Sequence, residues 1–150
     1  MTILTRRNTI GILLAATIAK PALAQSPPVY AEGGKAIDGT DTVAYFTRGR
    51  AVAGAQSHTV IWNGSMWLFS SAENKAMFEA DPEKYAPKYG GYCAWAMSRG
   101  YVAPTAPEAW SIVDGKLYLN YSLDIRERWS RDVHTNIARA DAFWPKPLEN

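Results

Sequence analysis

The only cysteine of this 150-residue chain, Cys93, lies in the segment YGGYCAWA, residues 89–96. A cysteine can bind a soft metal, act as a nucleophile or pack as a small hydrophobe. The pair Gly90-Gly91 breaks the chain just before it, so we expect a helix from Tyr92 to Ser98 with Cys93 near its start. Unpaired amides at a helix start lower the pKa of a thiol, which favours a ligand or nucleophile, whereas the aromatic neighbours favour packing.

The side chains and glycines around this cysteine form the first candidate site, which would bind a small ligand. Its residues are Tyr89, Gly90, Gly91, Tyr92, Cys93 and Trp95. A wider aromatic set could line a pocket for a planar or apolar molecule, although core packing is the default role of such residues in a small domain. That set consists of Trp62, Trp67, Tyr89, Tyr92, Trp95 and Tyr101.

A soft-metal site is the second candidate. Cys93 and Met97 are four residues apart and would share one face of a helix. The chain has two histidines, His58 at the end of a predicted strand and His134 at the rim of a predicted helix. Copper or another soft metal held by Cys93, Met97 and a histidine is conceivable. A lone histidine without ligand spacing is weak evidence, so a solvated side chain is the alternative for each.

A thiol enzyme, such as a peroxidase or a disulfide exchanger, is a third possibility. It would need an acidic thiol at Cys93, and the chain has no second cysteine to resolve an intermediate. The acidic residues form no recognisable catalytic pair, and Gly90-Gly91 lacks the flanking glycine and lysine of a phosphate-binding loop. The residues therefore favour a binding protein over an enzyme, and we predict no catalytic residue.

The first 24 residues have the pattern of an export signal. Arg6 and Arg7 precede an apolar run, and a small-x-small pattern ends at Ala24, so we expect cleavage between Ala24 and Gln25. The paired arginines also partly match a twin-arginine signal, with the general secretory route as the alternative. We therefore expect a periplasmic or secreted protein without a membrane span in its mature chain.

The charge balance argues against a nucleic-acid partner. Cleavage would remove Arg6, Arg7 and Lys20 from the 16 basic residues and none of the 14 acidic ones, so the net charge falls from +2 to about −1. The basic character of the full chain thus belongs to the signal, and the mature chain lacks the clustered positive charge that nucleic acids require.

Downstream of the signal we expect a mobile leader at residues 25–35 and one domain at residues 36–146. After a short helical turn around Val43, the segment HTVIWNGSMWLFS, residues 58–70, predicts a hairpin with Asn63-Gly64 as its turn. That register places Trp62 opposite Ser65, Ile61 opposite Met66 and His58 opposite Phe69, with both faces covered. Ser70 and Glu73 then form a capping-box pattern for a helix that reaches Asp81.

The C-terminal third predicts a second hairpin and a long helix. Asp114-Gly115 is the turn of the hairpin, which places Trp110, Ile112, Leu117 and Leu119 on one face. Ser122 is expected to cap one continuous helix whose apolar stripe is Ile125, Trp129, Val133, Ile137 and Ala140. Two hairpins interleaved with helices predict a small two-layer α+β domain.

The mature chain resembles the YHS-domain family along nearly all of its length. The resemblance is carried by DGTDTVAYF, by WNGSMWLFSSAENKAMFEADPEKYAPKYGGYCAWA, by KLYLNYS and by the final FWP. It is most similar to exported, stand-alone members, and it implies a small α+β module related to metal-handling proteins. Where metal-binding relatives carry cysteines, this chain has Ala44, Ser70 and Asn74, so the resemblance does not extend metal binding to it.

We therefore carry two hypotheses into the structure. The first is an exported, YHS-like, non-enzymatic module that binds a metal ion, with copper as one candidate, or a small ligand near YGGYC. The alternative is an accessory protein without a ligand, whose aromatic residues form its core and a surface for an envelope protein partner.

Overall fold

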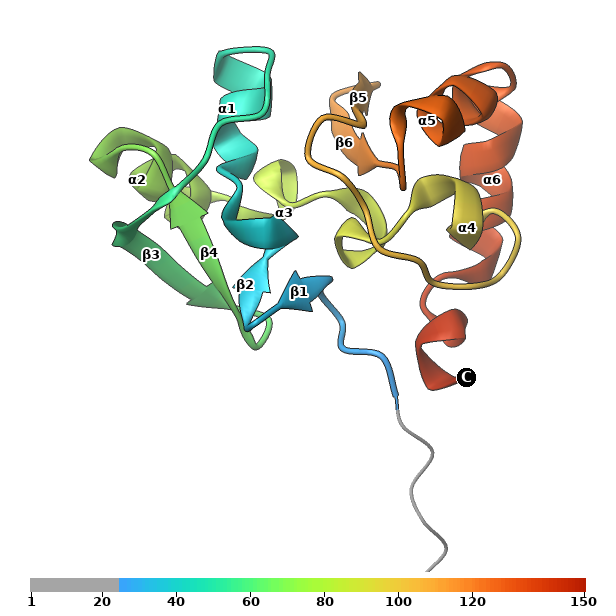
Figure 1. The fold of residues 1–150 in the computed structure, drawn as a ribbon, viewed down its shortest axis with the longest axis horizontal. Helices are drawn as coiled ribbons and strands as arrows, with labels where there is room; N and C mark the ends of the chain where they lie inside the picture. Colours follow the sequence, from blue (N-terminus) through green and yellow to red (C-terminus); the bar gives the residue numbers. More distant parts are fainter. Residues whose placement is uncertain (1–24) are drawn as a thin grey trace, which may run out of the picture.

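The computed structural model describes residues 25–150, so the predicted signal peptide at 1–24 lies outside the described residues. Within this range the chain is an α+β domain with two small sheets and helices packed around them (Figure 1), which confirms the predicted class. The strands are β1 (Ala31–Glu32), β2 (Lys35–Ala36), β3 (Ala55–Trp62), β4 (Ser65–Phe69), β5 (Trp110–Val113) and β6 (Lys116–Leu119), and the α-helices are α1 (Thr42–Thr47), α2 (Ala72–Ala80), α3 (Pro82–Tyr85), α4 (Ala94–Met97), α5 (Leu123–Ser130) and α6 (Val133–Phe143).

The first sheet has the strand order β1-β2-β4-β3, and its long hairpin β3-β4 turns where the sequence predicts. Asn63 and Gly64 have φ values of 48° and 76°, the conformation that a two-residue type I′ turn requires. Trp62 pairs with Ser65 as predicted, and the next pair also agrees. The turn therefore fixes the register over the half of the hairpin that lies next to it.

Farther from the turn the predicted register is wrong. Phe69 pairs with Ala55 instead of His58, because the register shifts between Ala55 and Thr59. The Thr59 hydroxyl donates to the Gln56 carbonyl oxygen at 2.7 Å, a local bond that takes this part of β3 out of the ladder. One face is also less covered than predicted, since Ile61 is 68% exposed.

The helix after this hairpin begins one residue later than predicted. Ser71, not Ser70, is the N-cap of α2, and its hydroxyl oxygen accepts a hydrogen bond from the Asn74 amide at 3.1 Å. Ser70 is unavailable as a cap because both its amide and its hydroxyl donate to the Asp41 carboxylate. Pro82 then starts α3, where a missing N–H costs nothing.

The second hairpin, β5-β6, lies between two cores and confirms the predicted alternation. Leu117 and Leu119 are fully buried in the larger core, which lies toward the first sheet, and Trp110 and Ile112 pack against the same core. Tyr118, on the opposite face, belongs to the smaller core. The residues of the smaller core are Tyr89, Ala94, Met97, Tyr118, Trp129 and Ala140.

The predicted single C-terminal helix is in fact two helices. Ser122 caps α5 as expected, with its hydroxyl accepting from the Ile125 amide, but α5 ends at Ser130 and α6 starts at Val133. The break is stabilised by Asn136, whose side-chain amide donates to the Trp129 carbonyl oxygen at 3.0 Å. In a continuous helix, a backbone amide one turn later would have bonded to this carbonyl oxygen. At the end of α5 the Asn136 side chain takes the place of that amide.

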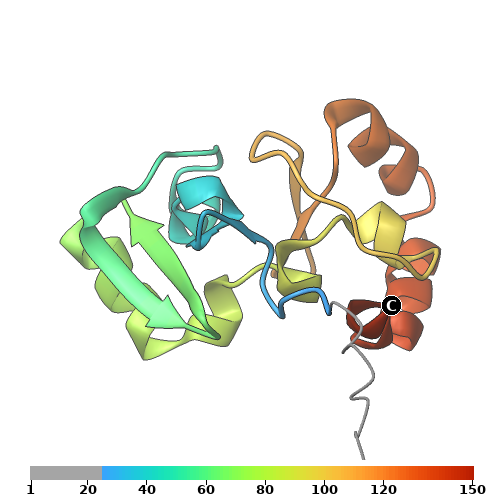
Figure 2. The ribbon, with the colours of Figure 1, turned by 60° about the horizontal axis from the view of Figure 1, so that its bottom comes forward.

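The ordered domain begins earlier than the predicted boundary at Ala36. Val29 is 1% exposed within the larger core, and the Tyr30 amide donates to the Gly90 carbonyl oxygen at 2.8 Å. The molecule has two halves, one that contains β3, β4 and α2 and one that contains α4, α5 and α6 (Figure 1). Figure 2 shows the N-terminal segment crossing between them. Part of the predicted leader at 25–35 is therefore a structural element, because it supplies an apolar side chain to the core.

The domain also extends past its predicted end at residue 146. Pro147 is buried, and the Leu148 carbonyl oxygen accepts from the Ser26 amide at 2.9 Å. This bond joins the two ends of the described chain beside the segment at residues 89–91.

Candidate functional site

The turn at Tyr89-Gly90-Gly91 has a backbone shape that only glycines allow at its centre. Tyr89 and Gly90 have φ values of 59° and 64°, and a Cβ at Gly90 would collide with the carbonyl oxygen of Pro28. A Cβ at Gly91 would collide with the Ile37 side chain. The two glycines therefore let this turn lie directly against the N-terminal segment and the larger core.

Tyr89 is held firmly despite its left-handed backbone. Its ring is buried in the smaller core, and its hydroxyl donates to an Asp141 carboxylate oxygen at 2.8 Å. Burial, followed by the Asp141 carboxylate, raises the pKa of this hydroxyl. The phenol therefore stays protonated and serves as a fixed wall, not as an acid or base near neutral pH.

Tyr92 fastens the N-terminal segment to the domain. Its hydroxyl donates to the Pro27 carbonyl oxygen at 2.8 Å, and its ring lies 5.9 Å from that of Tyr30. The side chain is 6% exposed, and burial raises the pKa of its hydroxyl. Tyr92 thus has a structural role, whereas the sequence predicted that it would bind a ligand.

Cys93 is enclosed as a packed side chain. Its sulfur accepts a hydrogen bond from the Tyr121 amide at 3.3 Å and donates to the Asn120 side-chain oxygen at 3.6 Å. Burial raises the pKa of the thiol even though nearby backbone amides act in the opposite direction. The acidic thiol that a thiol enzyme would need is therefore not favoured, because α4 is four residues long and desolvation outweighs the amides at its start.

Trp95 and Tyr89 do not line a common hollow. The Arg99 guanidinium covers its ring at 3.2 Å from the centroid. Trp95 and Cys93 line a small hollow of about 250 Å³ together with Ala96, Tyr101, Ala103, Tyr121 and Ile125. The predicted YGGYC site is therefore divided. Cys93 and Trp95 line this hollow, whereas Tyr89 and Gly90 line a separate groove.

The candidate metal ligands do not come together as one set. Met97 is fully buried in the smaller core at the end of α4, and Cys93 is the N-cap residue of that short helix. His58 lies on β3 and His134 on α6, elements at opposite ends of the molecule (Figure 1). Within residues 25–150, no three side chains of histidine, cysteine, aspartate or glutamate form a metal-binding group. Copper binding stays a prediction for elemental analysis.

The three positions where the resemblance places metal-ligating cysteines do converge, around a carboxylate. Asp41 is fully buried, and its oxygens accept from the Ala44 amide at 3.1 Å, from the Ser70 hydroxyl and from the Asn74 side-chain amide at 2.8 Å. The Ser70 amide donates to the same carboxylate at 2.8 Å. Four hydrogen bonds thus join α1, the end of β4 and α2 through one buried carboxylate.

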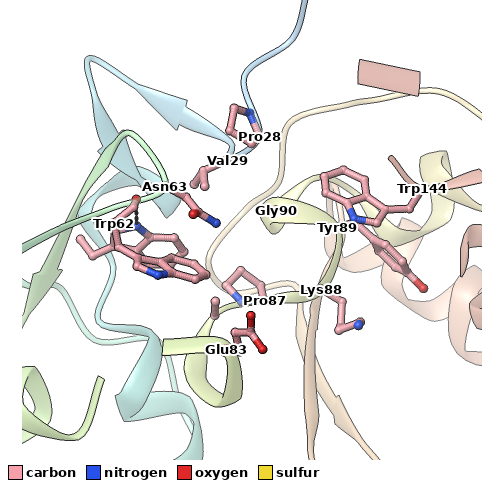
Figure 3. A pocket seen from close by; sticks show the side chains of 12 residues that line it. Pro28, Val29, Trp62, Asn63, Glu83, Pro87, Lys88, Tyr89, Gly90 and Trp144 are labelled. Atoms are coloured by element: carbon pink, nitrogen blue, oxygen red, sulfur yellow. Dashed lines mark hydrogen bonds between the residues drawn. The ribbon is translucent and has the colours of Figure 1, made fainter. Parts of the chain in front are cut away.

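A groove of about 380 Å³ lies between the two halves of the molecule, and Tyr89 and Gly90 form part of it (Figure 3). Its walls come from distant parts of the sequence: Trp62 from the first hairpin and Trp144 from the end of α6. The lining consists of Pro28, Val29, Trp62, Asn63, Trp67, Glu83, Ala86, Pro87, Lys88, Tyr89, Gly90 and Trp144.

The indoles at this groove are fixed by their neighbours. The Trp67 ring nitrogen donates to the Trp62 carbonyl oxygen at 2.9 Å, and the two rings meet edge to face at 5.5 Å. Trp144 packs edge to face against Tyr89 at 6.1 Å. Both walls are therefore built before any ligand arrives, as in most small-molecule sites.

The structure brings only part of the predicted aromatic set to the groove. Trp62, Trp67 and Tyr89 line it, whereas Trp95 and Tyr101 line the other hollow and Tyr92 packs on the N-terminal segment. Glu83 was missed because nothing in its local sequence marks it, and Trp144 was noted only within the final FWP motif of the resemblance. Asn63 was predicted only as a turn residue, and its side chain also reaches the groove (Figure 3).

The structure is thus a small α+β domain with an aromatic-walled groove. Comparison of the chain with protein-family models, with curated proteins and with solved structures gave no match. The resemblance to the YHS-domain family therefore stays a prediction from sequence motifs. None of the helices within residues 25–150 has the length and apolar character needed to cross a membrane.

Proposed function

We propose that this chain is an exported, YHS-like binding module without catalytic activity, and that it holds a small organic ligand in the groove beside Tyr89 and Gly90. The observation that carries the proposal is the groove itself. Its volume of about 380 Å³ falls in the usual range for small-molecule sites. Its aromatic walls are held in place by contacts between the lining residues themselves.

The lining supports binding over catalysis. Among its residues, the side chains that titrate are Glu83, Lys88 and Tyr89. The Tyr89 hydroxyl is already bonded to Asp141, and its raised pKa keeps it protonated. No nucleophile and base lie next to each other in this lining, which covalent catalysis would require. We therefore assign the groove to recognition.

An organic ligand also fits this lining better than a metal ion does. Copper and other soft metals prefer thiolate, thioether and imidazole ligands, and the groove residues offer none of these. Cys93 and Met97, which carry sulfur, are buried elsewhere.

The test is native mass spectrometry of the mature protein purified from the exported fraction, with elemental mass spectrometry on the same sample. We expect a small organic mass bound to the wild type and to a Tyr101→Ala control, whose side chain lies at the other hollow. Trp144→Ala should lose it while keeping the wild-type circular dichroism spectrum. A ligand retained by Trp144→Ala and by Trp62→Ala would contradict the assignment. Copper near one per chain that is lost in Cys93→Ala would favour metal binding instead.

A second function, an accessory protein without a ligand, is favoured by one surface feature. Tyr101, Tyr121 and Leu123 are 51%, 57% and 52% exposed, and the two tyrosines line the hollow next to Cys93. Exposed apolar side chains that gather at one place often mark a protein contact. In the same purification, an empty groove together with a stoichiometric envelope protein that Tyr121→Ala releases would favour this alternative.

A further inference from the structure

The groove carries a carboxylate that has no cation of its own. Glu83 lies in the first turn of α3, and within residues 25–150 it takes part in no ion pair. Figure 3 shows its carboxylate beside Pro87, at the edge of the groove between Trp62 and Tyr89. A ligand with a positive charge at this point would supply the missing partner.

The lysine that lines the same groove does not neutralise this carboxylate. Figure 3 shows the Lys88 ammonium directed away from the indoles of Trp62 and Trp144. The neighbouring Lys84 lies over the ring of Tyr85 at 5.2 Å, so it is also engaged elsewhere. The charge at this edge of the groove is therefore negative.

The indole walls favour the same sign of charge. A tryptophan ring attracts a cation near its face, and a planar cation can stack on the ring while its edge donates hydrogen bonds. Trp62 and Trp144 form opposite walls, and the Asn63 side chain reaches the groove between them (Figure 3). Aromatic walls and an unpaired carboxylate together select a ligand that is both flat and positively charged.

We propose that the ligand of this groove is a planar organic cation with an amidinium- or guanidinium-type group directed to Glu83. This inference rests on the proposed binding function of the groove and names the chemical class of its ligand. The flat part of the ligand lies between the indoles of Trp62 and Trp144. Its N–H groups donate to the Glu83 carboxylate, so charge and shape are recognised by different residues.

The experiment is a titration of the mature protein with three probes of nearly equal shape: benzamidine, which is cationic, benzamide, which is neutral, and benzoate, which is anionic. Two-dimensional ¹H–¹⁵N spectra follow the indole N–H signals of the tryptophans. Because Glu83 is exposed, we expect benzamidine to bind only about two- to fivefold more tightly than benzamide. Benzoate should bind more weakly than both.

Three variants locate the effect. Glu83→Gln should remove the preference for benzamidine over benzamide while leaving benzamide binding unchanged. Glu108→Gln, an exposed acid outside the groove lining, should keep the preference. Trp144→Ala should weaken all three probes.

The outcomes separate this inference from the proposed function. Equal binding of the three probes that Trp144→Ala abolishes would overturn the charge preference and leave the groove as a binding site. A preference for benzamidine that persists in Glu83→Gln would overturn the role of Glu83. If no probe shifts any indole signal, the ligand class is wrong, and the search for a co-purified ligand decides the proposed function on its own.

Discussion

At the residue scale, Asp41 shows how a buried charge can hold a small domain together. Its carboxylate receives two backbone amides, one hydroxyl and one side-chain amide from three elements. A buried charge is tolerated when hydrogen bonds replace its lost water, and here four donors do so. The carboxylate therefore joins α1, the end of β4 and α2 in the interior.

We expect Asp41→Asn to lower the free energy of unfolding by about 2–4 kcal/mol, because an amide cannot accept from all four donors and hydrogen bonds to charged groups are the stronger ones. Urea denaturation followed by circular dichroism measures this loss. Asp132→Asn is the matched control, since Asp132 is exposed and its side chain makes no capping bond. A loss below about 0.5 kcal/mol, the usual range for surface substitutions, would contradict the assignment.

Cys93 shows at the same scale that local position does not decide chemistry. Its place at the start of a helix predicts a lowered thiol pKa, but it is 1% exposed and burial raises the pKa. The missed partner is Asn120, whose side-chain oxygen accepts from the Trp95 amide at 3.0 Å and from the Cys93 sulfur. Cys93 and Asn120 together anchor the start of α4 to the end of β6.

At the element scale, the break between α5 and α6 is bridged by one buried side chain, Asn136. The apolar stripe has helical spacing across the break, so its periodicity cannot show where the chain bends. Asn136 supplies the bond to the Trp129 carbonyl oxygen that makes the bend stable, and it is itself buried. The bend lets Trp129 and Ala140 both reach the smaller core from different helices.

Asn136→Ala should therefore destabilise the protein by about 1–3 kcal/mol, because it leaves a buried carbonyl group without a partner. Thermal unfolding of the variant should show a lower melting temperature than the wild type. His134→Ala, an exposed change on the same helix, serves as the control and should leave it nearly unchanged. Equal melting temperatures for both variants would mean that the bend does not need this bond.

At the scale of the whole molecule, the interior holds phenols and a thiol that must stay protonated. Burial is the largest cause that raises the pKa of Tyr45, Tyr89 and Cys93, and it also helps to raise the pKa of Tyr30 to about 12. A group whose pKa is higher in the folded state contributes stability that is fully present below its unfolded pKa. That contribution is lost as the pH rises toward the folded pKa.

The free energy of unfolding should therefore fall with rising pH above about 8.5 for the thiol and above about 10 for the phenols, which are their unfolded values. Each such group contributes a slope of up to about 1.4 kcal/mol per pH unit in its range. Urea denaturation between pH 7 and pH 11 measures the slope. Tyr45→Phe should make it shallower and Tyr101→Phe should not, whereas a stability that is constant to pH 11 would contradict the account.

The sequence alone determined those elements whose cause is local. Asn63-Gly64 and Asp114-Gly115 set the two hairpins, because their positive φ values favour these residues, and Ser122 set the start of α5 through its own hydroxyl. The alternating residues of the second hairpin showed which side chains face each core. The α+β class follows from these elements.

Only the tertiary structure decided where the groove lies. Trp62, Glu83 and Trp144 are far apart in the chain, and they meet because the N-terminal segment and the end of α6 both pack beside the turn at Gly90. Periodicity carries no information about such long-range contacts. Burial likewise made Cys93 a packed side chain, since desolvation depends on everything around the thiol and not on its neighbours in sequence.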